Sequence, residues 1–180
     1  MTYYGPKELA ASFRTVRNNT IQIAEEIDEK DYGFQAAPGT RTVAQTLIHI
    51  ANTSGFPLAI HRDQKRSNFE GFDFMALMGP AMAREQKPHT KAEILDLLKK
   101  TGDEYASFLD GLTESVLAET VTQSPGQTPA AKSRMEMIMG TKEHEMHHRG
   151  QLMLMFRLLG GVPHMTRARE EMMARMQATR

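Results

Sequence analysis

Three of the seven histidines in this 180-residue chain lie within five positions, as His144, His147 and His148 in the stretch EHEMHHRGQ. A neutral imidazole nitrogen is a common ligand of zinc and of other divalent metal ions. Residues four apart on a helix are separated by about 40° in azimuth and about 6 Å in rise, so His144 and His148 can direct their rings at one ion. His147 is rotated about 60° from His144 in the other direction, which predicts a place at the rim. The spacing indicates a pair of metal ligands on one helix.

A catalytic metal site needs a third protein ligand, which must come from another helix. His49 is the candidate, because it lies mid-helix in TLIHIAN with Gln45, Asn52 and Phe56 along the same line. Such a partly polar strip is costly to bury unless it faces something polar. The alternative is that His49 is a hydrogen-bonded core histidine and that His144 and His148 are an exposed pair. The remaining histidines fall near predicted helix ends or loops and are expected to be solvent-exposed: His61, His89 and His164.

The composition restricts the chemistry further. The chain has no cysteine, which excludes disulfides, thiolate zinc sites and cysteine nucleophiles, so any metal must be held by nitrogen and oxygen. The 22 basic and 22 acidic side chains give a formal net charge of zero, so binding to nucleic acid or to an anionic membrane is not expected. No apolar window approaches the roughly 18 residues of a membrane span, and the N-terminal stretch does not resemble a signal peptide. We therefore expect a cytoplasmic protein.

Helices must position these residues, because apolar side chains recur at spacings of three and four along most of the chain. Thr90 and Glu93 have the spacing of a capping box, and Pro57 is expected to kink the helix that carries His49. The predicted helices cover residues 6–28, 42–64, 73–85, 90–112, 132–159 and a C-terminal stretch from 166. Four substantial helices, a long connection at 67–89 and few β-branched runs predict an all-α fold, a four-helix bundle that forms one domain over residues 1–180 with a short extra C-terminal helix.

Two segments resemble a known family. They are APGTRTVAQTLIHIA, which contains His49, and HEMHHRGQLMLMFRLLGGVP, which begins at His144. The second combines a histidine, three residues, HRGQ, an apolar run and a closing glycine before proline. Together they are similar to the DinB family of metal-dependent bundle proteins, also called DinB/YfiT-like, and the resemblance covers about residues 8 to 163.

The resemblance implies a bundle of up-down-down-up topology and a divalent metal held by His49, His144 and His148, with water completing the coordination. Zn, Ni or Fe would suit imidazole ligands. Arg149 and Gln151 also match the family motif, and we expect them to support helix packing and to hydrogen-bond around the ligands rather than to bind the metal. The resemblance also implies a homodimer, and the tail methionines Met172, Met173 and Met176 would cover either a neighbouring helix or a second subunit.

The same letters allow a rival interpretation, because residues 144–148 spell HExxH, the zincin pattern of two zinc ligands and a glutamate base. The metzincin extension is excluded by Gln151 and Leu154, where glycine and histidine would be required. Another zincin type takes a later glutamate, which the tail contains. Zincins normally bind peptide along an edge strand, and no convincing strand is predicted. Glu145 is therefore expected to be a helix-surface carboxylate or a group that supports the ligands.

Three neutral histidines with an open coordination position allow Lewis-acid chemistry or activation of a bound water or thiol. Relatives in the wider superfamily activate a small thiol for transfer to an electrophile. The resemblance thus implies a metal-dependent thiol S-transferase, or a related detoxifying transferase or hydrolase, with a small-molecule thiol or electrophile as substrate. The alternative is a non-catalytic metal-binding stress-response protein. An open cleft lined by polar groups would favour the enzyme, and a site sealed by Met and Leu would favour the alternative.

Overall fold

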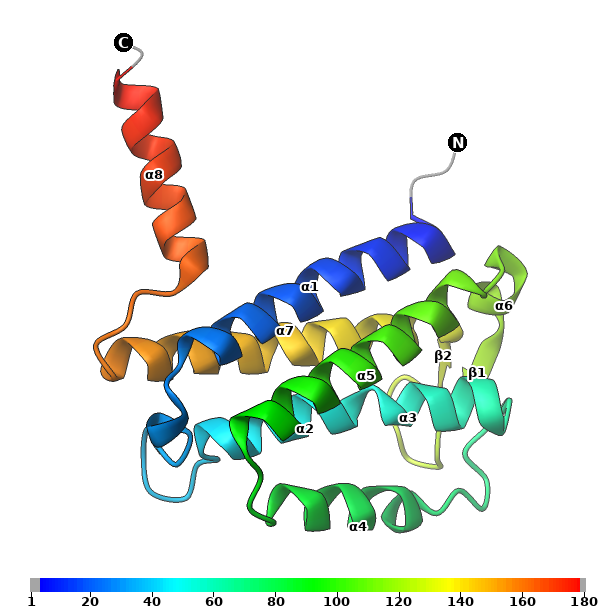
Figure 1. Ribbon diagram of the computed structural model, residues 1–180. Helices are drawn as coiled ribbons and strands as arrows, with labels where there is room; N and C mark the ends of the chain where they lie inside the picture. Colours follow the sequence, from blue (N-terminus) through cyan, green and yellow to red (C-terminus); the bar gives the residue numbers. More distant parts are fainter. Residues whose placement is uncertain (1–3, 179–180) are drawn as a thin grey trace.

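The computed structural model describes residues 4–178 and is mostly helical, which confirms the predicted fold class. Its main helices are α1 (Pro6–Glu26), α2 (Val43–Thr53), α5 (Lys91–Asp110) and α7 (Arg134–Leu158). α1 and α2 each pack against both α5 and α7. The chain runs in one direction along α1 and α7 and in the opposite direction along α2 and α5 (Figure 1). No helix within the described residues is long and apolar enough to cross a membrane.

Side-chain caps explain where the helices begin. The Thr42 hydroxyl accepts a hydrogen bond from the Gln45 backbone N–H, and the Gln45 side chain accepts one from the Thr42 N–H. Thr90 and Glu93 form the predicted capping box of α5. Such caps satisfy N–H groups that have no partner inside the helix. The start of α2 is thereby defined six residues before His49.

Pro57 interrupts the helix that carries His49. α2 ends at Thr53, and the chain continues through a short turn, α3 (Gly55–Pro57), and a π-helical turn, η2 (Leu58–Asp63). Proline has no N–H to donate to the carbonyl four residues earlier, which here belongs to Thr53. The irregularity thus falls within one turn of the predicted kink.

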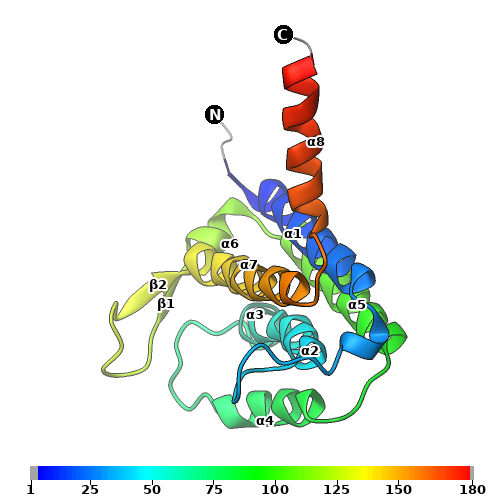
Figure 2. The ribbon, with the colours of Figure 1, turned by 90° about the vertical axis from the view of Figure 1, so that its left-hand side faces the viewer.

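Shorter elements surround these helices. α4 (Phe74–Glu85) lies inside the long connection and packs against α2, while η1 (Glu29–Asp31) follows α1 and α6 (Glu114–Ala118) follows α5. β1 (Thr120–Thr122) pairs antiparallel with β2 (Ala131–Ser133), a hairpin that the sequence interpretation did not include. α8 (His164–Ala178) projects away from the bundle (Figures 1 and 2), and none of its residues is buried.

A buried ion pair joins three of the main helices between two apolar clusters of the core. Arg17 of α1 donates to both carboxylate oxygens of Glu145 on α7, at 3.0 to 3.1 Å, and to the Leu98 carbonyl of α5 at 2.7 Å. The side chains of Arg17 and Glu145 are only 4% and 2% exposed. Gly102 of α5 leaves room for this arginine, because a Cβ there would lie 2.8 Å from Arg17 Cγ. Since removal of one partner would leave an uncompensated buried charge, the pair is needed for the packing of α1, α5 and α7.

Candidate metal centre

His49, His144 and His148 come together where α2 packs against α7. One ring nitrogen from each lies within 4.8 Å of the other two, and the ring centroids are 4.5 to 5.0 Å apart. His49 Nε2 and His144 Nε2 are separated by 2.8 Å. Two nitrogens bound to one tetrahedral zinc at about 2.0–2.1 Å would be roughly 3.3 Å apart. The rings of His49 and His144 would therefore move slightly apart to admit an ion. The donor set therefore fits a divalent metal.

A carboxylate from α4 sets the orientation of His49. His49 Nδ1 donates to Glu85 Oε1 at 2.7 Å, and Arg41 Nε donates to Glu85 Oε2 at 2.9 Å. A carboxylate only accepts hydrogen bonds, so Nδ1 carries a proton, and Nε2 is the nitrogen that faces the other imidazoles. Glu85 itself is buried. A carboxylate–histidine pair of this kind is the usual support of a metal-binding imidazole.

Gln151 has the corresponding role at His148. His148 Nδ1 donates to Gln151 Oε1 at 2.7 Å, and the amide nitrogen of Gln151 donates to His147 Nε2 at 3.2 Å. The hydrogen bond to the amide oxygen leaves Nε2 of His148 as the nitrogen with a lone pair. His147 is exposed beside the cluster, at the rim.

The protein environment favours the neutral form of His144 and His148. Burial, reinforced by the neighbouring His148 and His49, lowers the pKa of His144 to about 4. Burial also lowers the pKa of His148, although its hydrogen bond to Gln151 opposes the shift. Because only an unprotonated imidazole can bind a metal, both rings are ready to act as ligands at neutral pH.

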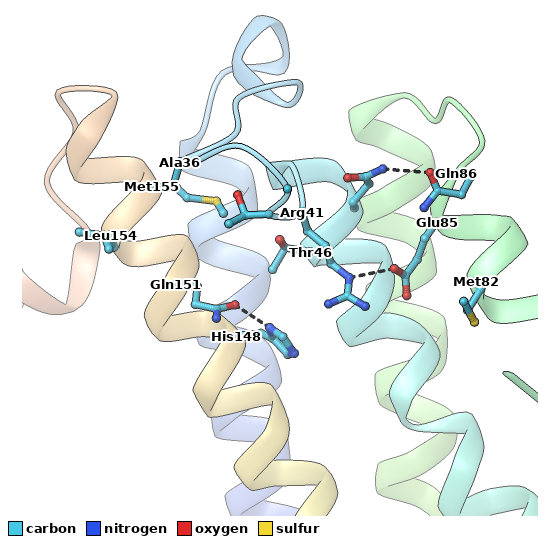
Figure 3. A pocket seen from close by; sticks show the side chains of 13 residues that line it. Ala36, Arg41, Thr46, Met82, Glu85, Gln86, His148, Gln151, Leu154 and Met155 are labelled. Atoms are coloured by element: carbon cyan, nitrogen blue, oxygen red, sulfur yellow. Dashed lines mark hydrogen bonds and ion pairs between the residues drawn. The ribbon is translucent and has the colours of Figure 1, made fainter. Parts of the chain in front are cut away.

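A cleft of about 690 Å³ opens beside His148. Figure 3 shows its walls, formed by the loop before α2, by α2 itself, by α4 and by the C-terminal half of α7. Polar side chains are prominent among them, namely Thr40, Arg41, Gln45, Thr46, Glu85, Gln86 and Gln151. The apolar part of the wall includes Met82, Leu154 and Met155. The histidine cluster thus reaches an open cleft through His148, and both polar and apolar side chains line that cleft.

Glu145 and Arg149 lie on the side of α7 that faces α1. Glu145 is held in the buried ion pair with Arg17, and the Arg149 guanidinium reaches the Val16 carbonyl of α1 at 3.5 Å. Within residues 4–178, neither side chain hydrogen-bonds to an imidazole of the cluster. Glu145 is therefore buried rather than at the helix surface, and the two residues support helix packing while Gln151 contacts a candidate ligand.

The expectation that His61 is solvent-exposed is wrong. His61 is only 6% exposed, because the helical segment continues past Pro57 and packs His61 against the start of α7. Its Nδ1 accepts a hydrogen bond from Arg134 Nη1 at 3.0 Å, and burial together with that positive charge lowers its pKa to about 4. His89 and His164 are also partly buried, and His164 Nε2 hydrogen-bonds to the Asn19 side chain at 3.0 Å.

The sequence interpretation missed Glu85 and Arg41. Glu85 lies 36 residues after His49, in a connection without a motif, so no local pattern pairs the two. Arg41 stands inside the stretch that resembles the family, but a single arginine in a polar loop gives no signal of its own.

Comparisons with known proteins agree with this architecture. The sequence matches the DinB family over residues 1–179. It is 21% identical to the uncharacterized protein YjoA of Bacillus subtilis (strain 168), over 85% of this chain and 90% of that protein. The crystal structure of YjoA, described as DinB-like, superposes with a TM-score of 0.64 at 19% identity over 86% of this chain and 93% of that one. The sibling lethal factor precursor DfsB gives a TM-score of 0.67 at 14% identity, over 89% of this chain and all of that one. The chain belongs to the DinB family.

Proposed function

We propose that this protein binds a divalent metal ion through His49, His144 and His148. The observation that carries the proposal is the hydrogen bond from His49 Nδ1 to the buried carboxylate of Glu85, which turns Nε2 toward the other two rings. A core histidine that merely needed a partner would not require two further imidazoles at its other nitrogen. Zn, Ni and Fe all accept such a nitrogen donor set.

We further propose that the site is catalytic, with a metal-dependent transfer of a small-molecule thiol to an electrophile as the reaction that suits it best. A bound divalent ion would supply Lewis acidity and lower the pKa of a water or thiol at its open position. The cleft beside His148 supports this proposal, since its volume of about 690 Å³ falls in the range of small-molecule sites. The Gln45, Gln86 and Gln151 amides and the Arg41 guanidinium would orient a substrate within it.

Two other functions have less support. A non-catalytic metal-binding stress-response protein would need no open cleft of small-molecule size next to its metal. A zincin-type peptidase would need Glu145 as a general base, whereas both oxygens of this carboxylate are taken by Arg17. The strands of the described residues, β1 and β2, are three residues each and pair with one another.

The test is elemental analysis of protein purified without an affinity tag, for the wild type and for His49→Ala, His144→Ala and His148→Ala. We expect near-stoichiometric metal in the wild type and a loss in all three variants. His147→Ala is the matched control, because this ring lies beside the cluster and should leave the metal content unchanged. A wild type without metal, or metal retained in His49→Ala, would contradict the proposed site. Protein loaded with metal would then be assayed for conjugation of small thiols to a model electrophile, with the metal-free protein as the blank.

A further inference from the structure

Arg41 is held beside the metal centre with part of its guanidinium unused. Its Nε donates to Glu85, and within the described residues no other hydrogen bond of this side chain is formed. The side chain is 43% exposed, and Figure 3 shows its terminal nitrogens in the cleft between Glu85 and His148. An arginine that served only to neutralise Glu85 would also donate to that carboxylate from a terminal nitrogen. The two terminal nitrogens instead remain available to a ligand, in the planar fork that matches a carboxylate.

The loop that carries Arg41 is fixed before any ligand arrives. Gln35 and Thr42 form an isolated antiparallel bridge across it, and the Gln35 amide donates to the Thr40 carbonyl. Gly39 supplies the left-handed backbone of the turn, with φ of +79°, and the Thr40 hydroxyl donates to the Ala37 carbonyl at 2.8 Å. The guanidinium is therefore presented by an ordered loop at the start of α2, and little conformational entropy is lost when it binds.

The charge of the cleft also favours an anion. Arg41 and Glu85 are the charged residues among its lining side chains, and the Glu85 carboxylate is shared between Arg41 and His49. A divalent ion on three neutral histidines would therefore leave a local excess of positive charge, although the chain as a whole has a formal net charge of zero. Such an excess in a concave site raises the local concentration of anions and disfavours cations.

We infer that the substrate of this site carries a carboxylate, which pairs with Arg41 while its reactive group reaches the ion held by His49, His144 and His148. The inference rests on the proposed function. The apolar wall of Met82, Leu154 and Met155 would cover the carbon chain between the two ends. The ligand class is thus a small organic acid, and Arg41 determines specificity without being a metal ligand.

The test compares three thiols on protein loaded with Co²⁺, in which thiolate binding is followed by its charge-transfer absorption. They are 3-mercaptopropionate, 2-mercaptoethanol and cysteamine, which end in a carboxylate, a hydroxyl and an ammonium group. Because the thiols differ in acidity, the readout is how the ratio of their dissociation constants changes between the wild type and each variant. We expect Arg41→Gln to weaken 3-mercaptopropionate relative to 2-mercaptoethanol by about tenfold. Arg41→Lys, which keeps the charge but loses the fork, should weaken it less.

Arg84→Gln is the matched control, since it removes the same charge from α4, where Arg84 Nη1 donates to Asn52 Oδ1 outside this cleft. Cobalt content is measured for every variant. If the wild type holds no cobalt or binds no thiol, the proposed function fails and this inference falls with it. If the wild type binds cobalt and thiols but the ratio is the same in Arg41→Gln, the metal site stands and the role of Arg41 is overturned. If inorganic phosphate competes with 3-mercaptopropionate for the cobalt-loaded wild type more strongly than acetate does, the carboxylate assignment is overturned.

Discussion

Glu85 offers the sharpest test of the metal centre, because it contacts a proposed ligand without being one. In Glu85→Ala, His49 Nδ1 loses its acceptor at 2.7 Å and the ring is free to rotate or to change tautomer. Loss of the hydrogen-bond partner of a metal-binding histidine typically costs 10–100-fold in metal affinity. This corresponds to about 1.4–2.7 kcal/mol of binding free energy. We expect a loss of that size for Zn²⁺, with the ion still bound.

The assay is competition for Zn²⁺ against a chromophoric chelator at pH 7.5, with folding of each variant checked by circular dichroism. Glu85→Gln should be intermediate, because its amide oxygen can still accept from Nδ1 but does not carry the charge that makes the imidazole a better donor. Glu143→Gln is the control, since it removes an exposed carboxylate next to His144 in the chain. A folded Glu85→Ala protein with the zinc affinity of the wild type would refute the assignment of His49 as a ligand oriented by Glu85.

The other predictions concern stability and assembly. The unfolded chain protonates His61 near its ordinary pKa of 6.5, whereas the folded protein does so only near 4, so the stability is fully present above pH 6.5 and falls as the pH drops toward 4. In urea unfolding of the metal-free proteins, the free energy of unfolding of His61→Gln should therefore fall by about 2 kcal/mol less than that of the wild type between pH 7 and pH 5. Glu145→Ala should cost about 3–5 kcal/mol in the same assay, because it leaves Arg17 buried and unpaired, yet the folded fraction should keep its zinc affinity; a loss of affinity would revive the HExxH interpretation. An isolated 15-residue helix is marginal in water, so α8, with Met165, Met172 and Met173 exposed, is expected to pack in a homodimer. Deletion of the chain from His164 onwards should then convert a dimer to a monomer in sedimentation equilibrium.

The parts of the fold that could be predicted are those with a local physical cause. Thr90 and Glu93 satisfy the free N–H groups at the start of α5, and this requires only a spacing of three residues. The pairing of His144 with His148 likewise follows from the pitch of one helix. The hairpin of β1 and β2 has strands of three residues, which are too short for an alternating pattern to stand out.

The parts of the site that could not be predicted depend on contacts between distant segments. Glu85 reaches His49 because α4 packs against α2, and nothing in the connection at 67–89 specifies that packing. His61 was expected at a helix end, but the helical segment continues through the π-helical turn after Pro57 and packs the ring beside Arg134. In both cases the partner comes from another element, so the side chain's environment is a property of the tertiary structure.

The HExxH spelling of residues 144–148 shows how helix packing decides what a motif can do. Successive residues on a helix point about 100° apart, so Glu145 cannot share the face of His144, and its partners depend on which helix lies beside it. In this chain that helix is α1, and Arg17 takes both oxygens of the carboxylate inside the core. A carboxylate fixed in this way is held in the core against α1 and is not directed at the imidazole cluster. The carboxylate that contacts a proposed ligand is instead Glu85, from a helix outside the motif, and it orients an imidazole rather than removing a proton from water. The HExxH motif of this chain therefore favours a site of three histidines beside a small-molecule cleft. The glutamate that a peptidase would need as its base, Glu145, stabilises the bundle instead.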